Sequence, residues 1–307
     1  MRARITAAAA LAAASLAAAC GGQAAAPAPR AAATAAPASV IGVTAPGIPR
    51  SWAPAAAFST AIGRPVGLVM YYSGWGEPFR SAFAATARQH GAEVMVNMDP
   101  SASLAAVARG DGDGYLRRFA AQLRAFGHPV VLAFGHEANG DWYSYGYRHQ
   151  AAAHYIAAYR KVHDVITAAG AGNVTWLWTV NIPVGTQTLP PAADWPGAAY
   201  VDWTGIDAYD WSGKETFAAE IGPTITAVRK LSTAPVLIAE TSVVPGPDAA
   251  AQVKGILAGI RADRLLGLVW FDADKAAYRH TADRHDWRIQ DDPAALAAFR
   301  AGIRGFG

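Results

Sequence analysis

The chain has 307 residues, 52% of them hydrophobic, and a formal net charge of +3. That length suits one large domain of roughly 250 residues. Basic residues form no stripe along the sequence, and the charge falls close to neutral if the segment that holds Arg2 and Arg4 is removed. A nucleic-acid partner is therefore not expected.

The first 20 residues have the pattern of an export signal. Arg2 and Arg4 precede an unbroken apolar and small-residue run, Ile5–Ala19, which is too short and too alanine-rich for a membrane span. The single cysteine, Cys20, follows this run in a segment that resembles a bacterial lipoprotein box, where the cysteine is lipidated and becomes the mature N-terminus. An ordinary secretory signal is the alternative. We expect an exported protein, attached to the membrane only through a lipid on Cys20 or otherwise secreted.

Residues 21–38 are rich in alanine and proline, which predicts a disordered linker. From residue 39 to the end, short apolar runs alternate with longer amphipathic stretches. The short runs predict strands at Val40–Thr44, Pro65–Tyr72, Glu93–Met98, Pro129–Phe134, Val174–Val180, Val201–Ala208, Pro235–Ala239 and Gly267–Phe271.

The longer stretches predict helices between these strands. Continuous apolar strands that alternate with helices indicate a parallel sheet buried on both faces. Eight such units without a glycine-rich dinucleotide motif favour a closed (β/α)8 barrel, of the α/β class, as a single domain over residues 39–307. The predicted helices are Glu77–His90, Gly114–Phe126, Ala151–Ala169, Phe217–Leu231, Ala249–Ala262 and Pro293–Ile303.

Polar and aromatic residues gather where the predicted strands end, which is the edge at which barrel enzymes place their active sites. Carboxylates and amides suit sugar hydroxyls, and aromatic rings suit the apolar faces of sugar rings. These side chains come from Tyr72–Trp75, Asn97–Asp99, His136–Glu137, Asn181, Asp207–Asp210, Glu240–Thr241 and Trp270–Asp272.

Two glutamates follow apolar strands directly, Glu137 after the fourth and Glu240 after the seventh. Strands four and seven face each other across a small barrel, so the two carboxyl groups are expected to meet at its mouth. Retaining glycosidases need such a pair, about 5–5.5 Å apart. An ion pair with arginine or a helix cap is the structural alternative for either residue alone.

The segment around Glu137 reads G-H-E-A-N-G-D-W-Y and resembles the His-Glu-x-Asn-Gly-x-Trp signature of glycoside hydrolase family 26, the β-mannanase family. Gly205–Tyr209 is similar to its Gly-x-Asp-x-Tyr motif, Ile238–Thr241 to the segment with its nucleophile, and Trp270–Phe271 to the end of its eighth strand. The resemblance spans nearly the whole domain in the family's order.

This resemblance implies a retaining double displacement without a cofactor or metal, in which Glu137 is the general acid/base and Glu240 the nucleophile. It also implies supporting roles for nearby residues. His136 and Tyr209 would orient the nucleophile and contact the sugar, Trp142 and Trp270 would stack on sugar rings, and Asp207 would support Tyr209 or the neighbouring strand ends.

Other residues at strand ends are weaker candidates from their position alone. Trp75 is as compatible with sugar stacking as with core packing. Asn181, Asn97 and Asp99 suit sugar hydroxyls and local turns equally well. A polar stretch, His280–Asp286, contains histidines and aspartates, but their spacing matches no helical metal motif, and we expect a surface loop.

The expected partner is a polysaccharide, cleaved internally by a monomeric enzyme. β-1,4-Mannan is the leading substrate because of the family resemblance. The chain departs from the mannanase pattern at Ala133–Gly135, where Arg-Pro-Leu is usual, and at Met98–Pro100, where Trp-Glu-Pro is frequent. Mixed-linkage β-1,3-1,4-glucan is therefore an alternative substrate, and a noncatalytic carbohydrate-binding lipoprotein is the alternative of another class.

Overall fold

A computed structural model describes residues 39–210, 215–275 and 285–307. The expected signal, the linker and Cys20 lie outside the described residues, as do His280 and Asp283. Among the helices that are described, none combines the length and apolar character that a membrane crossing requires.

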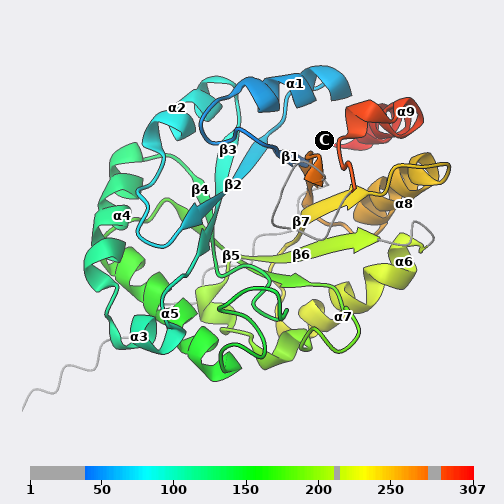
Figure 1. The fold of residues 1–307 in the computed structure, drawn as a ribbon. Helices are drawn as coiled ribbons and strands as arrows, with labels where there is room; N and C mark the ends of the chain where they lie inside the picture. The colour runs from blue at the N-terminus through cyan, green and yellow to red at the C-terminus, as the bar shows by residue number, and fades with distance from the viewer. Residues whose placement is uncertain (1–38, 211–214, 276–284) are drawn as a thin grey trace, which may run out of the picture. The chain divides into compact units, whose positions relative to one another are not determined.

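Eight parallel strands form a closed barrel in which each strand pairs with its neighbours in the sequence and β8 pairs with β1 (Figure 1). This confirms the predicted (β/α)8 barrel. The strands are β1 (Val40–Thr44), β2 (Leu68–Gly74), β3 (Glu93–Asp99), β4 (Val130–Phe134), β5 (Val174–Asn181), β6 (Trp203–Asp210), β7 (Val236–Val243) and β8 (Gly267–Phe271).

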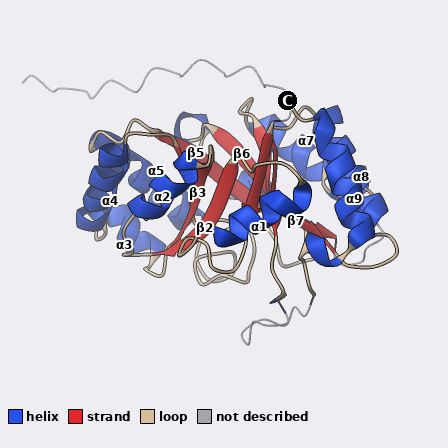
Figure 2. Cartoon of the chain, turned by 90° about the horizontal axis from the view of Figure 1, so that it is seen from above, coloured by secondary structure: helices blue, strands red, loops and turns tan. Residues whose placement is uncertain are grey.

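Helices surround the barrel (Figure 2). The sequence did not predict α1 and α3, and the helix predicted from Phe217 to Leu231 is divided at Ile221 into α6 and α7. The helices are α1 (Ala53–Ile62), α2 (Ser81–Gln89), α3 (Leu104–Arg109), α4 (Asp113–Phe126), α5 (Ala152–Ala168), α6 (Phe217–Glu220), α7 (Gly222–Leu231), α8 (Ala249–Ala262) and α9 (Pro293–Gly302).

The apolar core has two layers, one on each side of the strands. The outer layer lies between strands and helices, and α4 shows how a helix joins it: Leu116, Phe119, Ala120 and Leu123 recur at helical spacing and are buried. The inner layer fills the barrel and consists of Leu68, Met70, Met95, Val131, Ala133, Leu177, Leu237, Ala239, Leu266 and Val269.

Closure of the barrel requires a glycine at the start of β8. Gly267 has a φ of 143° and pairs with Val40 of β1. A Cβ atom on Gly267 would lie 1.9 Å from the carbonyl oxygen of Val40, closer than any side chain allows. The absence of a side chain therefore lets β8 approach β1 and complete the ring.

Candidate active site

The side chains at the barrel mouth follow from strand alternation. Residues two apart on a strand share a face, so Tyr72 continues the inward row of Leu68 and Met70, and Asn97 continues that of Met95. The carboxyl ends of all eight strands lie at one end of the barrel. Polar side chains from distant parts of the sequence therefore meet there, above the apolar inner layer.

Glu240 enters the mouth because β7 is irregular at this point. Leu237 and Ala239 both face the barrel interior, so simple alternation would turn Glu240 outward. The pairing register between β6 and β7 shifts by one residue after Ile238, which places Glu240 opposite Asp207. Such a bulge re-aims the following side chain, and β7 continues beyond Glu240 to Val243 instead of ending there.

Glu137 lies three residues beyond the end of β4, in a turn. Its φ of 51° is in the left-handed region, which non-glycine residues adopt at a cost and which clusters at functional sites. Gly135 has a φ of 59° and approaches the ring of Tyr155, where a Cβ atom would lie 3.1 Å from a ring carbon. This tight turn directs the Glu137 side chain to the mouth.

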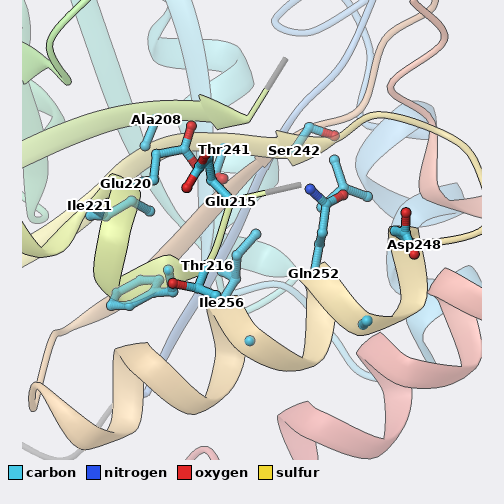
Figure 3. A pocket seen from close by; sticks show the side chains of 14 residues that line it. Ala208, Glu215, Thr216, Glu220, Ile221, Thr241, Ser242, Asp248, Gln252 and Ile256 are labelled. Carbon is cyan, nitrogen blue, oxygen red and sulfur yellow. The ribbon is translucent and has the colours of Figure 1, made fainter. Parts of the chain in front are cut away.

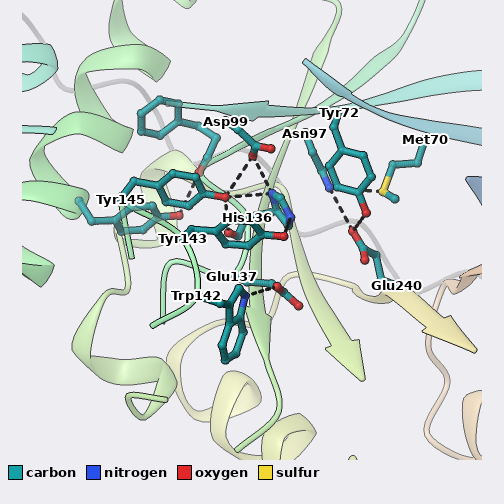
Figure 4. Close-up of polar contacts among 12 residues, drawn as sticks. Met70, Tyr72, Asn97, Asp99, His136, Glu137, Trp142, Tyr143, Tyr145 and Glu240 are labelled. Carbon is teal, nitrogen blue, oxygen red and sulfur yellow. Dashed lines mark hydrogen bonds and ion pairs between the residues drawn. The ribbon is translucent and has the colours of Figure 1, made fainter. Parts of the chain in front are cut away.

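Both carboxylate oxygens of Glu137 accept hydrogen bonds from nitrogen donors. Trp142 Nε1 donates to Oε2 over 2.7 Å (Figure 4), and Asn181 Nδ2 donates to Oε1 over 2.5 Å. Asn139 fixes Asn181 in place, since its side chain bonds the backbone N–H and carbonyl of Asn181, each over 2.9 Å. Two residues of the motif after β4 therefore position its glutamate, Trp142 by a direct hydrogen bond and Asn139 through Asn181.

Glu240 is held by hydroxyl groups. Tyr72 Oη donates to Oε1 over 2.6 Å and Tyr209 Oη donates to Oε2 over 2.9 Å. Asn97 Nδ2 lies 3.5 Å from Oε1. Glu240 itself is 5% exposed. A buried carboxylate with a donor on each oxygen is fixed in orientation and stabilised in its ionised form.

The charge state of Glu240 reflects opposing effects. Burial raises the pKa of Glu240, and so does the negative charge of Glu137, whereas the positive charge of His136 and the hydrogen bonds from Tyr72 and Tyr209 lower it; the net shift is upward. The charges of the two glutamates therefore act on each other at the mouth.

His136 lies near both glutamates, in a hydrogen-bond network of its own (Figure 4). Its Nδ1 is 2.7 Å from Asp99 Oδ1 and its Nε2 is 3.0 Å from Tyr143 Oη. Tyr145 Oη lies 3.2 Å from Asp99 Oδ1 and donates to the His136 carbonyl over 3.0 Å. No hydrogen bond joins His136 to a glutamate among the described contacts, so its influence on them is electrostatic.

His136 carries a positive charge at neutral pH. Burial disfavours the charged ring, but the negative charge and hydrogen bond of Asp99, with the charges of Glu240 and Glu137, raise the pKa of His136 to about 9. The imidazolium then donates from both nitrogens. One positive charge among three carboxylates lets the site hold an ionised nucleophile despite its burial.

Asp207 lies on β6 beside the pair but is fully buried. No hydrogen bond of ordinary geometry reaches either carboxyl oxygen among the described residues, and none joins Asp207 to Tyr209. The backbone N–H of Glu240 is still near enough to lower the pKa of Asp207 in part. Burial raises the pKa of Asp207, and the charges of Glu240 and Glu137 raise it further. The predicted support of Tyr209 is therefore not seen as a hydrogen bond, and a neutral carboxyl group is favoured here.

Two predicted stacking residues do not reach the mouth. Trp270 is 1% exposed, and its ring packs edge-on against Phe299 of α9. Trp75 packs in the outer layer against Tyr115 and Phe134. Trp270 therefore does not stack on a sugar as predicted, because alternation places it on the outward face of β8. Of the two possibilities left open for Trp75, the contacts favour core packing, although its ring is only partly buried.

Trp142, in contrast, combines a hydrogen bond to Glu137 with an indole that is 38% exposed. It is one of two large hydrophobic side chains that are exposed among the described residues, and Tyr72, at 39%, is the other. Sequence reasoning assigned no role to Tyr72. Phe271, the inward neighbour of Trp270, is the aromatic residue that β8 brings near Tyr209, with ring centres 6.0 Å apart.

A separate pocket of about 380 Å³ lies between the ends of β6 and β7 and helices α6 and α8 (Figure 3). Glu137 and Glu240 do not line it. Within the described part of the chain, no group of three histidine, cysteine or acidic side chains is arranged to hold a metal ion. The mouth itself offers carboxyl, hydroxyl and imidazole groups.

A (β/α)8 barrel with two carboxyl groups at the carboxyl ends of its strands is an arrangement found in barrel glycosidases. The model of glycosyl hydrolase family 26 matches residues 82–254, and the chain belongs to this family. It is also 30% identical, over 266 residues, to Endoglucanase H of Acetivibrio thermocellus. That match covers 80% of this chain but only 28% of the relative, so the chain spans less than a third of the relative's length.

Solved structures share the fold at low sequence identity. A double mutant of an endo-β-1,4-mannanase from Cellulomonas fimi superposes with a TM-score of 0.66 at 17% identity, covering 86% of this chain and 70% of that one. A family 26 β-mannanase from Bacteroides ovatus gives 0.64 at 16% identity, covering 87% and 89%. These similarities support the barrel fold.

Proposed function

We propose that the protein is an endo-acting, retaining β-glycanase with Glu240 as nucleophile and Glu137 as general acid/base. The arrangement of the two carboxyl groups carries this proposal. Glu240 is oriented by two hydroxyl donors next to a positive histidine, and all three lower its pKa against the larger upward effect of burial, as a nucleophile needs. Glu137 is itself only 6% exposed, and the exposed indole of Trp142 that donates to it borders the side from which a leaving sugar would approach.

In the first step, a Glu240 oxygen forms a bond to the anomeric carbon. The bond from that carbon to the leaving oxygen breaks, and the leaving oxygen takes the proton of Glu137. In the second step, Glu137 removes a proton from water, and the water oxygen replaces Glu240 at the anomeric carbon. Two inversions give a product with the configuration of the substrate.

We propose a β-glucan as the substrate, with mixed-linkage β-1,3-1,4-glucan as its first candidate. The support is the 30% identity to a relative named as an endoglucanase. β-1,4-Mannan is the second candidate, in keeping with the family resemblance. The named mannanases are only 16–17% identical to this chain, a level that supports the fold and does not select a sugar.

The test is reducing-sugar release from mixed-linkage β-glucan, mannan, galactomannan, xylan and cellulose. We expect release from mixed-linkage glucan and its loss in Glu137→Gln and Glu240→Gln. Release from mannan alone would overturn the glucan assignment and leave the mechanism intact. A folded protein that binds one polymer and cleaves none would instead be the noncatalytic carbohydrate-binding lipoprotein.

We also propose that the protein is exported and lipidated on Cys20, on the basis of the charged start and apolar run that precede this cysteine. In a bacterial host, the protein is then expected in the membrane fraction, with a mature N-terminal peptide that begins at a diacylglyceryl-modified Cys20. A Cys20→Ser variant should lose the lipid. Recovery of unmodified protein cleaved elsewhere would show ordinary secretion.

A further inference from the structure

Tyr72 is one of two tyrosines whose hydroxyl groups hold the buried carboxylate of Glu240. Each oxygen of Glu240 has its own tyrosine: Tyr72 Oη is 2.6 Å from Oε1 and Tyr209 Oη is 2.9 Å from Oε2. The two hydroxyls come from strands on different sides of the barrel, β2 and β6. The free protein therefore has a hydroxyl donor on each oxygen of Glu240. Oε1 has in addition only a long contact of 3.5 Å from Asn97 Nδ2, so Tyr72 is the strong donor on that oxygen.

The two tyrosines differ in their freedom to move. Tyr209 is 8% exposed and is packed edge-on against Phe271 and Trp287. Tyr72 is 39% exposed, and its ring contacts that of His136, 5.2 Å away (Figure 4). Of these two donors, Tyr72 alone has an open side from which a sugar ring can approach and displace its hydroxyl.

The reaction itself distinguishes the two oxygens. The oxygen that attacks becomes the bridging atom of a glycosyl ester, so it uses a lone pair, loses its negative charge and becomes a poor hydrogen-bond acceptor. The other oxygen becomes the ester carbonyl and still accepts a hydrogen bond. A hydrogen bond to the attacking oxygen therefore weakens during the reaction and its donor can be displaced, whereas a donor on the other oxygen can remain throughout.

We propose that Glu240 attacks through Oε1 and that Tyr72 is a positioning residue, which keeps Oε1 aimed and ionised until the sugar displaces its hydroxyl. This inference rests on the proposed function and extends it. Oε1 forms the bond to the anomeric carbon while the bond to the leaving oxygen breaks, and that oxygen takes the proton of Glu137. Tyr209 keeps its bond to Oε2, and the exposed Tyr72 ring borders the sugar that is being attacked.

The two hydrogen bonds then have different consequences for catalysis. Binding that is equal in the free protein and the transition state does not lower the barrier, and the Tyr72 bond is lost before the transition state. Tyr209, which stays in place, instead holds the carboxylate in the orientation that attack requires. Both bonds nevertheless stabilise the ionised carboxylate in the free protein and lower the pKa of Glu240. Removal of either hydroxyl therefore raises the pKa of Glu240, but only removal of the Tyr209 hydroxyl is expected to slow the reaction strongly.

The test compares Tyr72→Phe with Tyr209→Phe as its matched variant. In both, the acid limb of the kcat/KM profile, which reports the free protein, is expected to move to higher pH by about one unit. At pH values above that limb, Tyr72→Phe should keep kcat within roughly tenfold of the wild type. Tyr209→Phe should lose roughly 10²-fold, the scale of effect when a reacting group is no longer held in its attacking orientation.

An equally large kcat loss in Tyr72→Phe would overturn the assignment of Oε1, and an unmoved acid limb would overturn the positioning role. Tyr72→Ala also removes the aromatic ring that borders the sugar, so we expect KM to rise in this variant but not in Tyr72→Phe. Tyr115→Phe is the control, because its hydroxyl bonds the carbonyl of Glu77 away from the glutamates. It should leave all three parameters unchanged.

A second readout needs no substrate. Isotope-edited infrared titration of the Glu240 carboxylate, identified by subtraction of Glu240→Gln, is expected to give a higher midpoint in Tyr72→Phe than in the wild type. Failure of the proposed function would appear as absence of cleavage by the wild type, and the titration would still decide the role of Tyr72. An equal midpoint in Tyr72→Phe and the wild type would contradict the positioning role of Tyr72.

Discussion

Glu240→Gln is expected to lower kcat by about 10⁴-fold or more, since the amide is not nucleophilic and no glycosyl ester can form. The variant should still fold, because the glutamine oxygen can accept a hydrogen bond from one of the two tyrosines that hold Glu240. The measurement is reducing-sugar release on the cleaved polymer, with the temperature of unfolding as a control.

Chemical rescue separates this role from general damage. Glu240→Ala opens space beside the anomeric carbon, and added azide should restore turnover of an aryl glycoside with a good leaving group. The expected product is a glycosyl azide of inverted configuration, because only one displacement occurs. A Glu240→Gln variant with more than one per cent of wild-type activity would remove Glu240 from the mechanism.

Glu137→Gln is expected to lower kcat on the polymer by about 10²–10⁴-fold, the usual contribution of general acid–base catalysis. The loss should be much smaller for an aryl glycoside whose leaving group needs no proton. A uniform loss across leaving groups would mean that Glu137 does not donate the proton.

The backbone at Glu137 suggests a second variant. Its φ of 51° suits glycine, so Glu137→Gly keeps the turn unstrained while it removes the carboxylate. Azide should then enter at the second step and give a glycosyl azide of retained configuration. The opposite configurations from the Glu137 and Glu240 variants would identify the two roles independently.

The barrel could be predicted from the sequence because its strands are continuous apolar runs, and all five residues of β4 are buried. Strand ends were less predictable. The prediction ended the seventh strand at Ala239, yet Glu240–Val243 continue β7 and are buried. Polar residues that line a barrel mouth resemble the start of a loop in sequence, and only the structure distinguishes the two.

Alternation explains the errors at the site. Inward residues on β8 are Val269 and Phe271, so Trp270 had to face the helices. The same alternation along β2 turns Tyr72 inward to the mouth, whereas Trp75 was the predicted stacking candidate of this segment. Glu240 is the converse case, since alternation alone would turn it outward and the bulge after Ile238 returns it to the mouth. A one-residue register shift leaves no clear signal in a single sequence.

The most direct test of the mechanism is the anomeric configuration of the first product, followed by proton NMR during the opening minutes of cleavage of the preferred polymer. A nucleophilic Glu240 and an acid/base Glu137 predict that the new reducing end forms as the β-anomer and then equilibrates with the α-anomer. Initial formation of the α-anomer would contradict a covalent intermediate on Glu240, and the two carboxyl groups would then have to act through a single inverting displacement.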